Sequence, residues 1–576
     1  MDITQIFIAA AIFVLIGLLV WGRWSVVGVF ASIAFSFYLT GLISFEAFAQ
    51  QLINPGLVTV VLLMLVATVL DKVRLLELWV KKLLSGSPRW ALLKLLGAVG
   101  LYSPFLNNTA VVASLIGPLR SVSKENAPKF LLPMAYASTI GGVTTLIGTS
   151  TSLLVAGFVV AAGLPELNIF TPMPVGVLLF VACLGVMVLV HPLLLRGQAT
   201  DPTTYERYLI QTEVAGDSPL IGQSVEASGL NDLDALRLIE IVRPGQLIAP
   251  VRPHQVIGAR DVLVFAGDLE RLDLLTQFSG LVTYGHAGGI PTDNLLKVVV
   301  SGESMLLGQR LRAVDFRTQF DASLVAVRHV ARRSRPRGYQ PKRIRAGDML
   351  VLAVGRDFES RNNLARNFIP LSRPIIQKFT QPWKSALALG GFALSVIAAA
   401  FGWMPFIKSL TILLVVFLAA GLVSPSELRR NVPWQLIITI ASALVISQVL
   451  TTSGLAELVA QNALMTIGSD PRLAFCVVLI LTALLTEMMT NNAAAALMFP
   501  ISLSASMTLG VDHMPFVMAV VFGASASFLT PHAYQTNLMV MSPGGYRPRD
   551  YLRAGAPVSL TYLLLAAWLV PLFFPF

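Results

Sequence analysis

Two pairs of adjacent asparagines are the residues of this sequence best suited to bind a small ligand. The stretch SPFLNNTAVVASLIGP carries Asn107 and Asn108, and the stretch TEMMTNNAAAALMFP carries Asn491 and Asn492. A side-chain amide offers one acceptor oxygen and two donor hydrogens. Hard cations take oxygen ligands, and Na⁺ follows the same logic. The pairs therefore predict a polar site for small ions that is built twice, once in each half of the chain.

Each asparagine pair has a polar companion further along the chain. The segments GGVTTLIGTSTSLL at 141–154 and SASFLTPHAYQTNLM at 525–539 interrupt apolar helices with glycine, hydroxyl residues and proline. Such broken helices expose N–H groups with partial positive charge and carbonyls with partial negative charge, which suit an anion and a cation respectively. Gly148 allows close approach of the backbone to a ligand, and Pro531 prevents an internal hydrogen bond.

These polar breaks contain no Lys or Arg. A bound anion would therefore be held by amides, hydroxyls, helix ends and co-bound cations. A structural alternative exists, because Asn, Thr and Ser also join membrane helices through interhelical hydrogen bonds. The two asparagine pairs and their two companion segments make four matched polar breaks in two halves, which favours a binding site over this structural role.

Composition places the chain among polytopic membrane proteins. Of its 576 residues, 55% are hydrophobic and 13% charged, and the mean hydropathy is +0.73, well outside the soluble range. Two apolar segments, 91–119 and 472–509, are broken by the asparagine pairs and predict re-entrant hairpins, which must be buried in protein or line a cavity. A span needs about 20 apolar residues, and roughly ten further stretches qualify: 6–22, 25–46, 54–70, 130–162, 172–195, 383–402, 407–424, 434–452, 514–542 and 556–575.

The basic residues between these stretches predict an orientation. Under the positive-inside rule, both termini are expected outside the cell inner (plasma) membrane, and the polar insert between the halves is expected in the cytoplasm. The first span is expected to be a retained helix and not a signal peptide. The two halves then run in opposite orientations, which predicts two inverted repeats, a typical secondary-transporter architecture with the site at the repeat interface.

Four phrases carry a resemblance to a known family. FLNNTAVVA, GGVTTLIGTSTSLLV, TEMMTNNAAAALMFP and ASASFLTPHAYQTNLMVMSPGGYRPRDYLRAG are similar to the divalent anion/sodium symporter (DASS) family of the ion transporter superfamily, and most to its sulfate-permease-like branch. The resemblance covers almost the whole chain. It implies a homodimeric symporter that couples Na⁺ to a small divalent anion by alternating access, with sulfate preferred over a dicarboxylate.

The same resemblance implies which residues form the site. The family's Ser-Asn-Thr motif at each hairpin tip matches residues 107–109 and 490–492, where Asn107 replaces Ser and Asn492 replaces Thr. These two departures leave the identity of the anion open. The implied substrate-binding residues are Asn107, Asn108, Thr109, Thr149, Ser150, Thr490, Asn491, Asn492, Thr530 and Pro531. The implied sodium-binding residues are Ser103, Asn108, Gly148, Asn491 and Ala533.

The polar insert contains a repeat of its own. GDSPLIGQSVEASGL is echoed by GESMLLGQRLRAVDF, and Gly222 precedes Asp261 by 39 residues as Gly308 precedes Asp348 by 40. Two such copies resemble the C-terminal regulatory domain of potassium-conductance regulators (TrkA-C, or RCK C-terminal), a small α/β ligand-sensing module. The expected domains are membrane repeats at 1–199 and 376–576 and TrkA-C-like regulatory domains at 200–289 and 290–375.

A basic run in the second copy includes Arg328, Arg332 and Arg333. It could capture a nucleotide-like acidic ligand from the cytosol, or it could be a solvated hairpin near anionic lipid headgroups. No G-x-G-x-x-G fingerprint precedes either copy, so NAD binding is not expected. The net charge of +11 follows from the positive-inside bias and does not indicate a nucleic-acid partner.

Several alternatives remain at this level. Glu487, the one acid close to the asparagine pairs, could hydrogen-bond the hairpin backbone or relay protons, and the structural role is favoured. A ligand-gated channel is the second function class, although no TVGYG filter is present. Within the carrier class, dicarboxylate, arsenite or sodium/proton transport are alternatives. No nucleophile–base pair or metal cluster indicates an enzyme, and Cys183 and Cys476 have no metal spacing.

Overall fold

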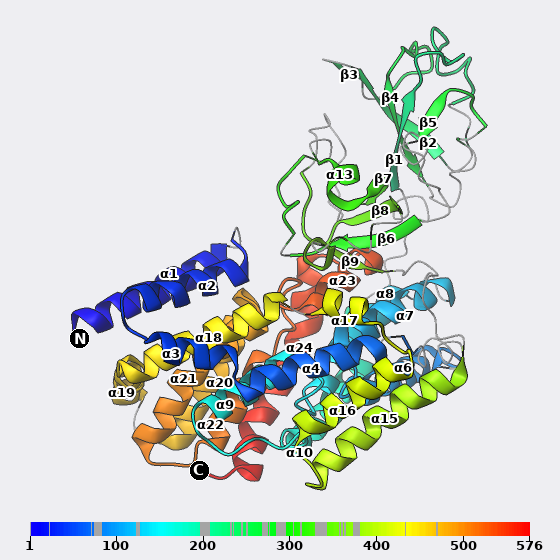
Figure 1. Ribbon diagram of the computed structural model, residues 1–576. Helices are drawn as coiled ribbons and strands as arrows, with labels where there is room; N and C mark the ends of the chain where they lie inside the picture. The colour runs from blue at the N-terminus through cyan, green and yellow to red at the C-terminus, as the bar shows by residue number, and fades with distance from the viewer. Residues whose placement is uncertain are drawn as a thin grey trace.

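The computed structural model (Figure 1) consists of a body of helices with an antiparallel β-sheet on one side of it. The sheet, coloured green, lies beyond the end of the body where α23 (Gln535–Gly544) is drawn. The structure describes residues 2–21, 24–70, 72–73, 83–122, 127–195, 208–230, 233, 236–243, 246–248, 251–267, 275, 277–283, 295–302, 304–310, 314–328, 343–355, 358, 361, 364–371, 381–432, 434–467 and 470–576.

Among the described residues, the helices of the two halves follow the same order, except that α19 has no described counterpart in the N-terminal half. The N-terminal half contains α1 (Ile3–Trp21), α2 (Val26–Leu39), α3 (Phe45–Leu52), α4 (Pro55–Leu70), α6 (Pro88–Tyr102), α7 (Asn108–Val122), α8 (Ala127–Gly142), α9 (Ser150–Ala161) and α10 (Met173–Leu194). The C-terminal half contains α15 (Pro382–Ala400), α16 (Phe406–Ala419), α17 (Pro425–Asn431), α18 (Trp434–Thr452), α19 (Leu455–Ile467), α20 (Pro471–Met488), α21 (Asn491–Leu509), α22 (Met514–Ala524), α23 and α24 (Pro548–Phe573). In both halves, a hairpin and a broken helix precede the last long helix.

Six described helical segments are long and apolar enough to cross a membrane by length and composition. This number is lower than the roughly ten expected, and seven further apolar helices are shorter, with 10–17 residues. Part of the difference has a clear cause, because the apolar stretches 130–162 and 514–542 are each divided by a polar break into two helices. The second hairpin also differs from the expectation, since its arms α20 and α21 both count among the six.

Capping residues determine where the helices at the breaks begin and end. Thr490 has extended backbone angles, and its hydroxyl accepts a hydrogen bond from the N–H of Ala493. Thr149 does the same for α9 through the N–H of Ser152. Such side chains satisfy N–H groups that have no partner inside the helix. The starts of α21 in the second hairpin and of α9 in the first break are thus encoded locally, by a threonine at the N-cap position of each helix.

Helices of one half pack against helices of the other. α2 packs on α18 and α4 on α16, while α10 packs on α24. α7 packs on α23 and α21 on α9, so each hairpin meets the broken helix of the opposite half. Within the halves, α6 packs on α8 as α20 packs on α22. The packing pattern is therefore preserved when the two halves are exchanged, and the polar segments meet at its centre.

In the described part of the insert, nine strands form one antiparallel sheet. Their order is β3-β2-β4-β1-β7-β8-β6-β9, and β5 pairs with β1. β1 pairs with β4 and β5 as β6 pairs with β8 and β9, so the same three-stranded unit occurs twice and the β1–β7 pairing joins the copies. The strands are β1 (Tyr208–Val214), β2 (Leu236–Arg243), β3 (Gln246–Ile248), β4 (Val262–Gly267), β5 (Leu281–Thr283), β6 (Leu295–Val300), β7 (Ala322–Arg328), β8 (Met349–Val354) and β9 (Phe368–Pro370).

Matching turns accompany the matching strands. Gly222 and Gly308 both have left-handed backbone angles, with φ of 85° and 77°, which glycine adopts without strain. Oδ2 of Asp261 accepts a hydrogen bond from the N–H three residues before it at 2.7 Å, and Asp348 repeats this contact at 2.9 Å. Asp261 also binds the Arg243 guanidinium at 2.8 and 2.7 Å, which raises the pKa of Arg243. The sequence repeat is therefore also a repeat of hydrogen bonds.

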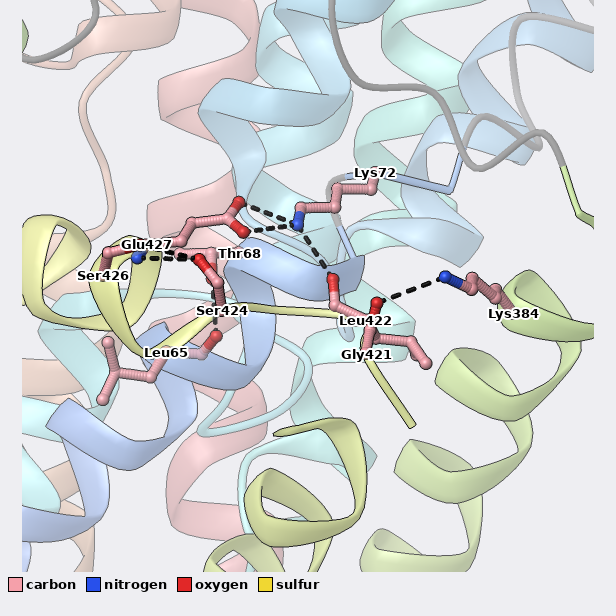
Figure 2. Close-up of polar contacts among 9 residues, drawn as sticks. All are labelled: Leu65, Thr68, Lys72, Lys384, Gly421, Leu422, Ser424, Ser426 and Glu427. Atoms are coloured by element: carbon pink, nitrogen blue, oxygen red, sulfur yellow. Dashed lines mark hydrogen bonds and ion pairs between the residues drawn. The ribbon is translucent and has the colours of Figure 1, made fainter. Parts of the chain in front are cut away.

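An ion pair joins the two halves of the helical body (Figure 2). Lys72, just after α4, lies 2.7 Å from Glu427 of α17, and its Nζ also donates to the carbonyl of Leu422 at 2.9 Å. Both side chains are mostly buried, with 10% and 14% of their surface exposed. Lys384 donates to the neighbouring carbonyl of Gly421 at 3.2 Å, at the more exposed edge of the same turn. The two lysines thus bind the carbonyls of the turn that follows α16.

We expect Lys72→Met to lower the free energy of unfolding by about 3–5 kcal/mol, because it leaves the Glu427 carboxylate buried without its partner. The double variant Lys72→Met/Glu427→Gln should recover part of this loss. Lys384→Met, which removes one exposed hydrogen bond, is the matched control and should cost about 1 kcal/mol or less. Denaturant unfolding of the purified protein in detergent measures all three. Equal losses for the two lysine variants would contradict a buried pair between the halves.

Candidate functional site

The same hydrogen-bond motif holds both hairpin tips. In the first half, the Ser103 hydroxyl contacts Oδ1 of Asn108 and lies 2.7 Å from the carbonyl of Ser138. In the second half, the Thr486 hydroxyl lies 2.7 Å from Oδ1 of Asn491 and 2.8 Å from a carbonyl of α22. Both asparagines are buried, with 1% and 6% exposed. The central Asn of each pair is therefore a fixed part of its tip.

The broken helices match each other as well as the hairpins do. Thr145 donates to the carbonyl of Pro104 at 2.6 Å and accepts the N–H of Gly148 at 3.2 Å. Thr530 donates to the carbonyl of Glu487 at 3.3 Å and accepts the N–H of Ala533 at 3.2 Å. The first break therefore corresponds to the second with Gly148 in the place of Ala533.

Each tip contacts the broken helix of the opposite half. Nδ2 of Asn108 donates to the hydroxyl of Tyr534 at 3.1 Å, and the Thr109 hydroxyl lies 3.3 Å from Oε1 of Gln535. In the other direction, the Thr151 hydroxyl donates to Oδ1 of Asn492 at 3.0 Å, and that of Ser150 lies 3.4 Å from the same oxygen. Four polar elements from two halves thus meet at one place.

Small residues permit this close approach. A Cβ on Gly142 would lie 2.7 Å from the Asn108 side chain, and a Cβ on Gly148 would lie 2.2 Å from the carbonyl oxygen of Gly142. Both distances are far below a normal contact, so only glycine fits at these positions. In the first break, Gly142 thus packs against the Asn108 side chain and Gly148 packs against the backbone of Gly142.

A cavity of about 2300 Å³ opens beside the tips. Among its described lining residues, Arg429 is the one Lys or Arg and Glu487 the one acid, so their formal charges cancel. Its wall extends from the tips to the second copy of the insert, including residues 301–302 and 368–370. The polar lining residues near the tips are Asn107, Thr109, Ser150, Thr151, Glu487, Thr490, Asn491, Asn492, Thr530, His532, Tyr534 and Gln535.

The sequence-predicted site residues divide into two groups. Those that line the cavity are Asn107, Thr109, Gly148, Ser150, Thr490, Asn491, Asn492, Thr530 and Ala533. Those that are buried but do not line it are Ser103, Asn108, Thr149 and Pro531. Ser103 and Asn108 instead contact each other inside the first tip, outside the described cavity lining. Among the described residues, no group of three His, Cys, Asp or Glu side chains could hold a metal ion.

Glu487 has a structural contact that the sequence did not predict. Its Oε1 accepts the N–H groups of Phe528 and Leu529 at 2.7 Å each, and its Oε2 accepts that of Thr530 at 3.0 Å. The expected partner was the backbone of its own hairpin, and the actual partner is the break of α22 and α23. The corresponding position in the first half is Pro104, which has no side-chain acceptor. This carboxylate therefore joins hairpin to break in one half only.

Sequence reasoning missed four polar residues of this site: Thr145, Thr486, Tyr534 and Gln535. A signal for one of them, Thr486, exists in retrospect. Ser103 and Thr486 each stand five residues before the central Asn, the spacing at which both hydroxyls reach the amide. For Tyr534 and Gln535 the partners lie 426 residues away in the chain, and no local pattern predicts such a contact.

The chain belongs to the citrate transporter family, whose model matches residues 8–523 and, in a second match, residues 396–575. It is therefore a multi-pass membrane transporter of the ion transporter superfamily and not an enzyme. This agrees with the family predicted from the four phrases around the hairpins and breaks.

Three relatives illustrate the breadth of the likeness. A putative sulfur deprivation response regulator of Chlamydomonas reinhardtii is 28% identical over 567 residues, which cover 93% of this chain and 96% of that protein. The uncharacterized transporter YfbS of Escherichia coli (strain K12) is 26% identical over 599 residues, covering 96% of each chain. Sodium/sulfate cotransporter 1 of Chlamydomonas reinhardtii is 27% identical over 389 residues, which cover 63% of this chain and 43% of that protein.

Proposed function

We propose that this protein is a sodium-coupled secondary transporter that imports a small divalent anion, sulfate, by alternating access. The observation that carries the proposal is the contact of each buried hairpin tip with the broken helix of the opposite half, through Asn108 with Tyr534 and Asn492 with Thr151. A site shared by two halves changes when one half moves against the other. Inverted repeats with re-entrant hairpins would give that movement its two alternating openings.

The charges around the cavity support coupling to a cation. A divalent anion brings two negative charges, and the described lining residues supply one basic and one acidic side chain. Without a surplus of fixed positive charge, co-bound Na⁺ ions are the means of neutralisation. The central asparagines and the hydroxyls of Ser103 and Thr486 offer the oxygen ligands that such ions prefer.

Sulfate is proposed over citrate or succinate for two reasons. Relatives named sodium/sulfate cotransporters match 63% of this chain, and the tips present amides and hydroxyls without a pair of basic groups that could hold two separated carboxylates. The family model is described as a citrate transporter, which makes a carboxylate the specific competing candidate.

Uptake of radiolabelled sulfate into proteoliposomes, with succinate and citrate as competitors, tests the assignment. We expect saturable sulfate uptake that excess unlabelled sulfate abolishes and that equimolar succinate or citrate leaves largely intact. Empty liposomes and liposomes with the Asn491→Ala protein are the controls. Uptake of labelled citrate or succinate without uptake of sulfate would replace sulfate by a carboxylate while retaining the carrier.

We further propose that the insert, as two TrkA-C-like domains, regulates transport. Its second copy contacts a helix of the transport site away from the tips, because Nη2 of Arg328 at the end of β7 donates at 2.8 Å to the carbonyl of Ser542, near the C-terminal end of α23. α23 begins with the residues that meet the first tip. A cytosolic ligand that shifts the second copy would therefore bias the conformation of this helix, by its differential affinity for the two states. Arg332 and Arg333, the other predicted regulatory residues, lie outside the described residues.

Arg328→Gln tests this route. We expect it to change the maximal rate of uptake several-fold while the affinity for sulfate stays within about twofold, because the tips contain no residue of the insert. Arg252→Gln, an exposed position in the first copy, is the control and should behave as the wild type. Complete loss of sulfate binding by a folded Arg328→Gln protein would make the insert part of the site itself.

A further inference from the structure

One pair of corresponding positions at which the two half-sites differ is Thr149 and Tyr534. Thr149 stands at the start of α9, and its hydroxyl accepts the N–H of Ser152 at 3.2 Å and lies 2.7 Å from the Ser152 hydroxyl. Its side chain is therefore occupied by its own helix. Tyr534 stands at the corresponding start of α23 and makes no such cap. Its longer side chain is free to reach the opposite half.

The Tyr534 ring reaches the first hairpin tip. Its hydroxyl oxygen accepts a hydrogen bond from Nδ2 of Asn108 at 3.1 Å, while Oδ1 of Asn108 is held by Ser103. A phenol that accepts through its oxygen still has its own hydrogen to donate. Because Tyr534 lines the cavity, that hydrogen is available to an anion bound there.

The second tip has no equivalent aromatic group. Nδ2 of Asn491 makes a long contact of 3.5 Å with the hydroxyl of Ser527, in its own half. The tip contact across the halves there comes from the short side chains of Ser150 and Thr151. The first tip is therefore contacted from the opposite half by a ring and the second by small hydroxyl residues.

We propose that Tyr534 determines the specificity of the site: its ring limits the ligand to a compact oxyanion, and its hydroxyl donates a hydrogen bond to it. This deepens the proposed transport function and rests on it. A tetrahedral dianion needs donors around one centre, which the second tip and the Tyr534 hydroxyl supply from two sides. A dicarboxylate needs two separated groups of donors, and the ring occupies the space beside the first tip where its second carboxylate would lie.

Two substitutions separate the roles of the ring and the hydroxyl. Tyr534→Phe keeps the ring and should raise the KM for sulfate about tenfold or more, as expected for one lost hydrogen bond to a charged group, without admitting succinate. Tyr534→Thr installs the residue of the first half and should add succinate uptake at least about tenfold above the wild type. The control is Tyr102→Phe, which removes a phenolic hydroxyl from the first hairpin. Tyr102 is not among the described residues that line the cavity, so this variant should keep the wild-type KM for sulfate.

The test measures initial uptake of labelled sulfate and succinate by the full-length protein in proteoliposomes. If the wild type carries sulfate and both Tyr534 variants keep its KM and its discrimination, the inference fails while the proposed function stands. If the wild type itself carries succinate as well as sulfate, the ring does not exclude it and the inference fails directly. Transport of neither anion by the folded wild type would overturn both proposals.

A measurement on the wild type covers the case in which the variants do not fold. Inhibition of sulfate uptake by oxalate, malonate and succinate should weaken with each added methylene group, because the ring sets an upper limit on length. Equal inhibition by all three dicarboxylates would contradict a size limit at Tyr534.

Discussion

Replacing Asn491 by alanine is expected to abolish anion uptake while leaving the protein folded. The Asn491 amide holds the Thr486 hydroxyl at 2.7 Å, and with it fixes the second tip against α22. Loss of the side chain removes both the oxygen proposed to bind Na⁺ and the fixed geometry of the tip. The cost to stability should be about 1–3 kcal/mol, too little to unfold the protein.

Asn108→Ala should have the same effect, because Asn108 holds the first tip through Ser103 and Tyr534. Asn462→Ala is the matched control. Its Nδ2 makes an exposed contact with the carbonyl of Leu458, four residues earlier in the same helix, and the variant should transport normally. Initial uptake rates in proteoliposomes, combined with size-exclusion profiles, measure both properties. Near-normal transport by either tip variant would locate the site elsewhere.

Replacing Glu487 by alanine should have the largest effect on stability. The change leaves the N–H groups of Phe528, Leu529 and Thr530 without their acceptor. Each lost hydrogen bond to a charged group is worth about 1.5–3 kcal/mol, so for three of them we expect a loss of at least about 4.5 kcal/mol together with loss of uptake. Denaturant unfolding and uptake assays on the same preparation measure both.

Glu487→Gln distinguishes a structural role from proton relay. Glutamine keeps one acceptor oxygen, which can still receive two of the three N–H groups, so stability and sodium-driven uptake should be partly retained. Glu457→Gln, on the exposed surface of α19 where the carboxylate accepts from Gln461 at 3.2 Å, is the control. If the Glu487→Ala variant has the same free energy of unfolding as the wild type, the carboxylate does not stabilise the break. A Gln variant that is fully stable but inactive would favour proton transfer.

The sequence predicts the polar elements of the site better than it predicts their mutual contacts. Adjacent amides such as Asn491 and Asn492 stand out because burying them is costly unless they are hydrogen-bonded. The breaks stand out because glycine, threonine and proline disfavour continuous apolar helix. Their partners cannot be read in this way, since Asn108 and Tyr534 are 426 residues apart and only the packing of α7 on α23 brings them together.

Glu487 illustrates the same limit. Its position one turn before the tip suggested a structural contact with the hairpin backbone. The partner was wrong, because the exposed N–H groups of the break at 528–530 compete for the carboxylate. An interrupted helix leaves several N–H groups without acceptors. The Glu487 carboxylate binds these groups, because the start of its own hairpin helix is already capped by Thr490.

The repeat in the insert was visible from Gly222 and Gly308, whose left-handed turns require glycine. The pairing of β1 with β7 was not, because strand edges carry no local signal for the strand they join. This pairing makes the two copies one sheet. Similarly, the docking of Arg328 on α23 depends on the placement of the whole insert, and the sequence suggested instead that the basic run containing Arg328 captures an acidic ligand or lies near lipid headgroups.

Dependence of sulfate uptake on the sodium gradient is the most direct test of the whole account. Proteoliposomes containing the wild-type protein are loaded with choline chloride and diluted into labelled sulfate with either sodium or choline outside, at equal pH on both sides. We predict accumulation of sulfate with external sodium, collapse of that accumulation when a sodium ionophore is added, and background uptake with choline. Undiminished uptake in choline, driven instead by an inward proton gradient, would contradict sodium coupling and assign the energy source to protons.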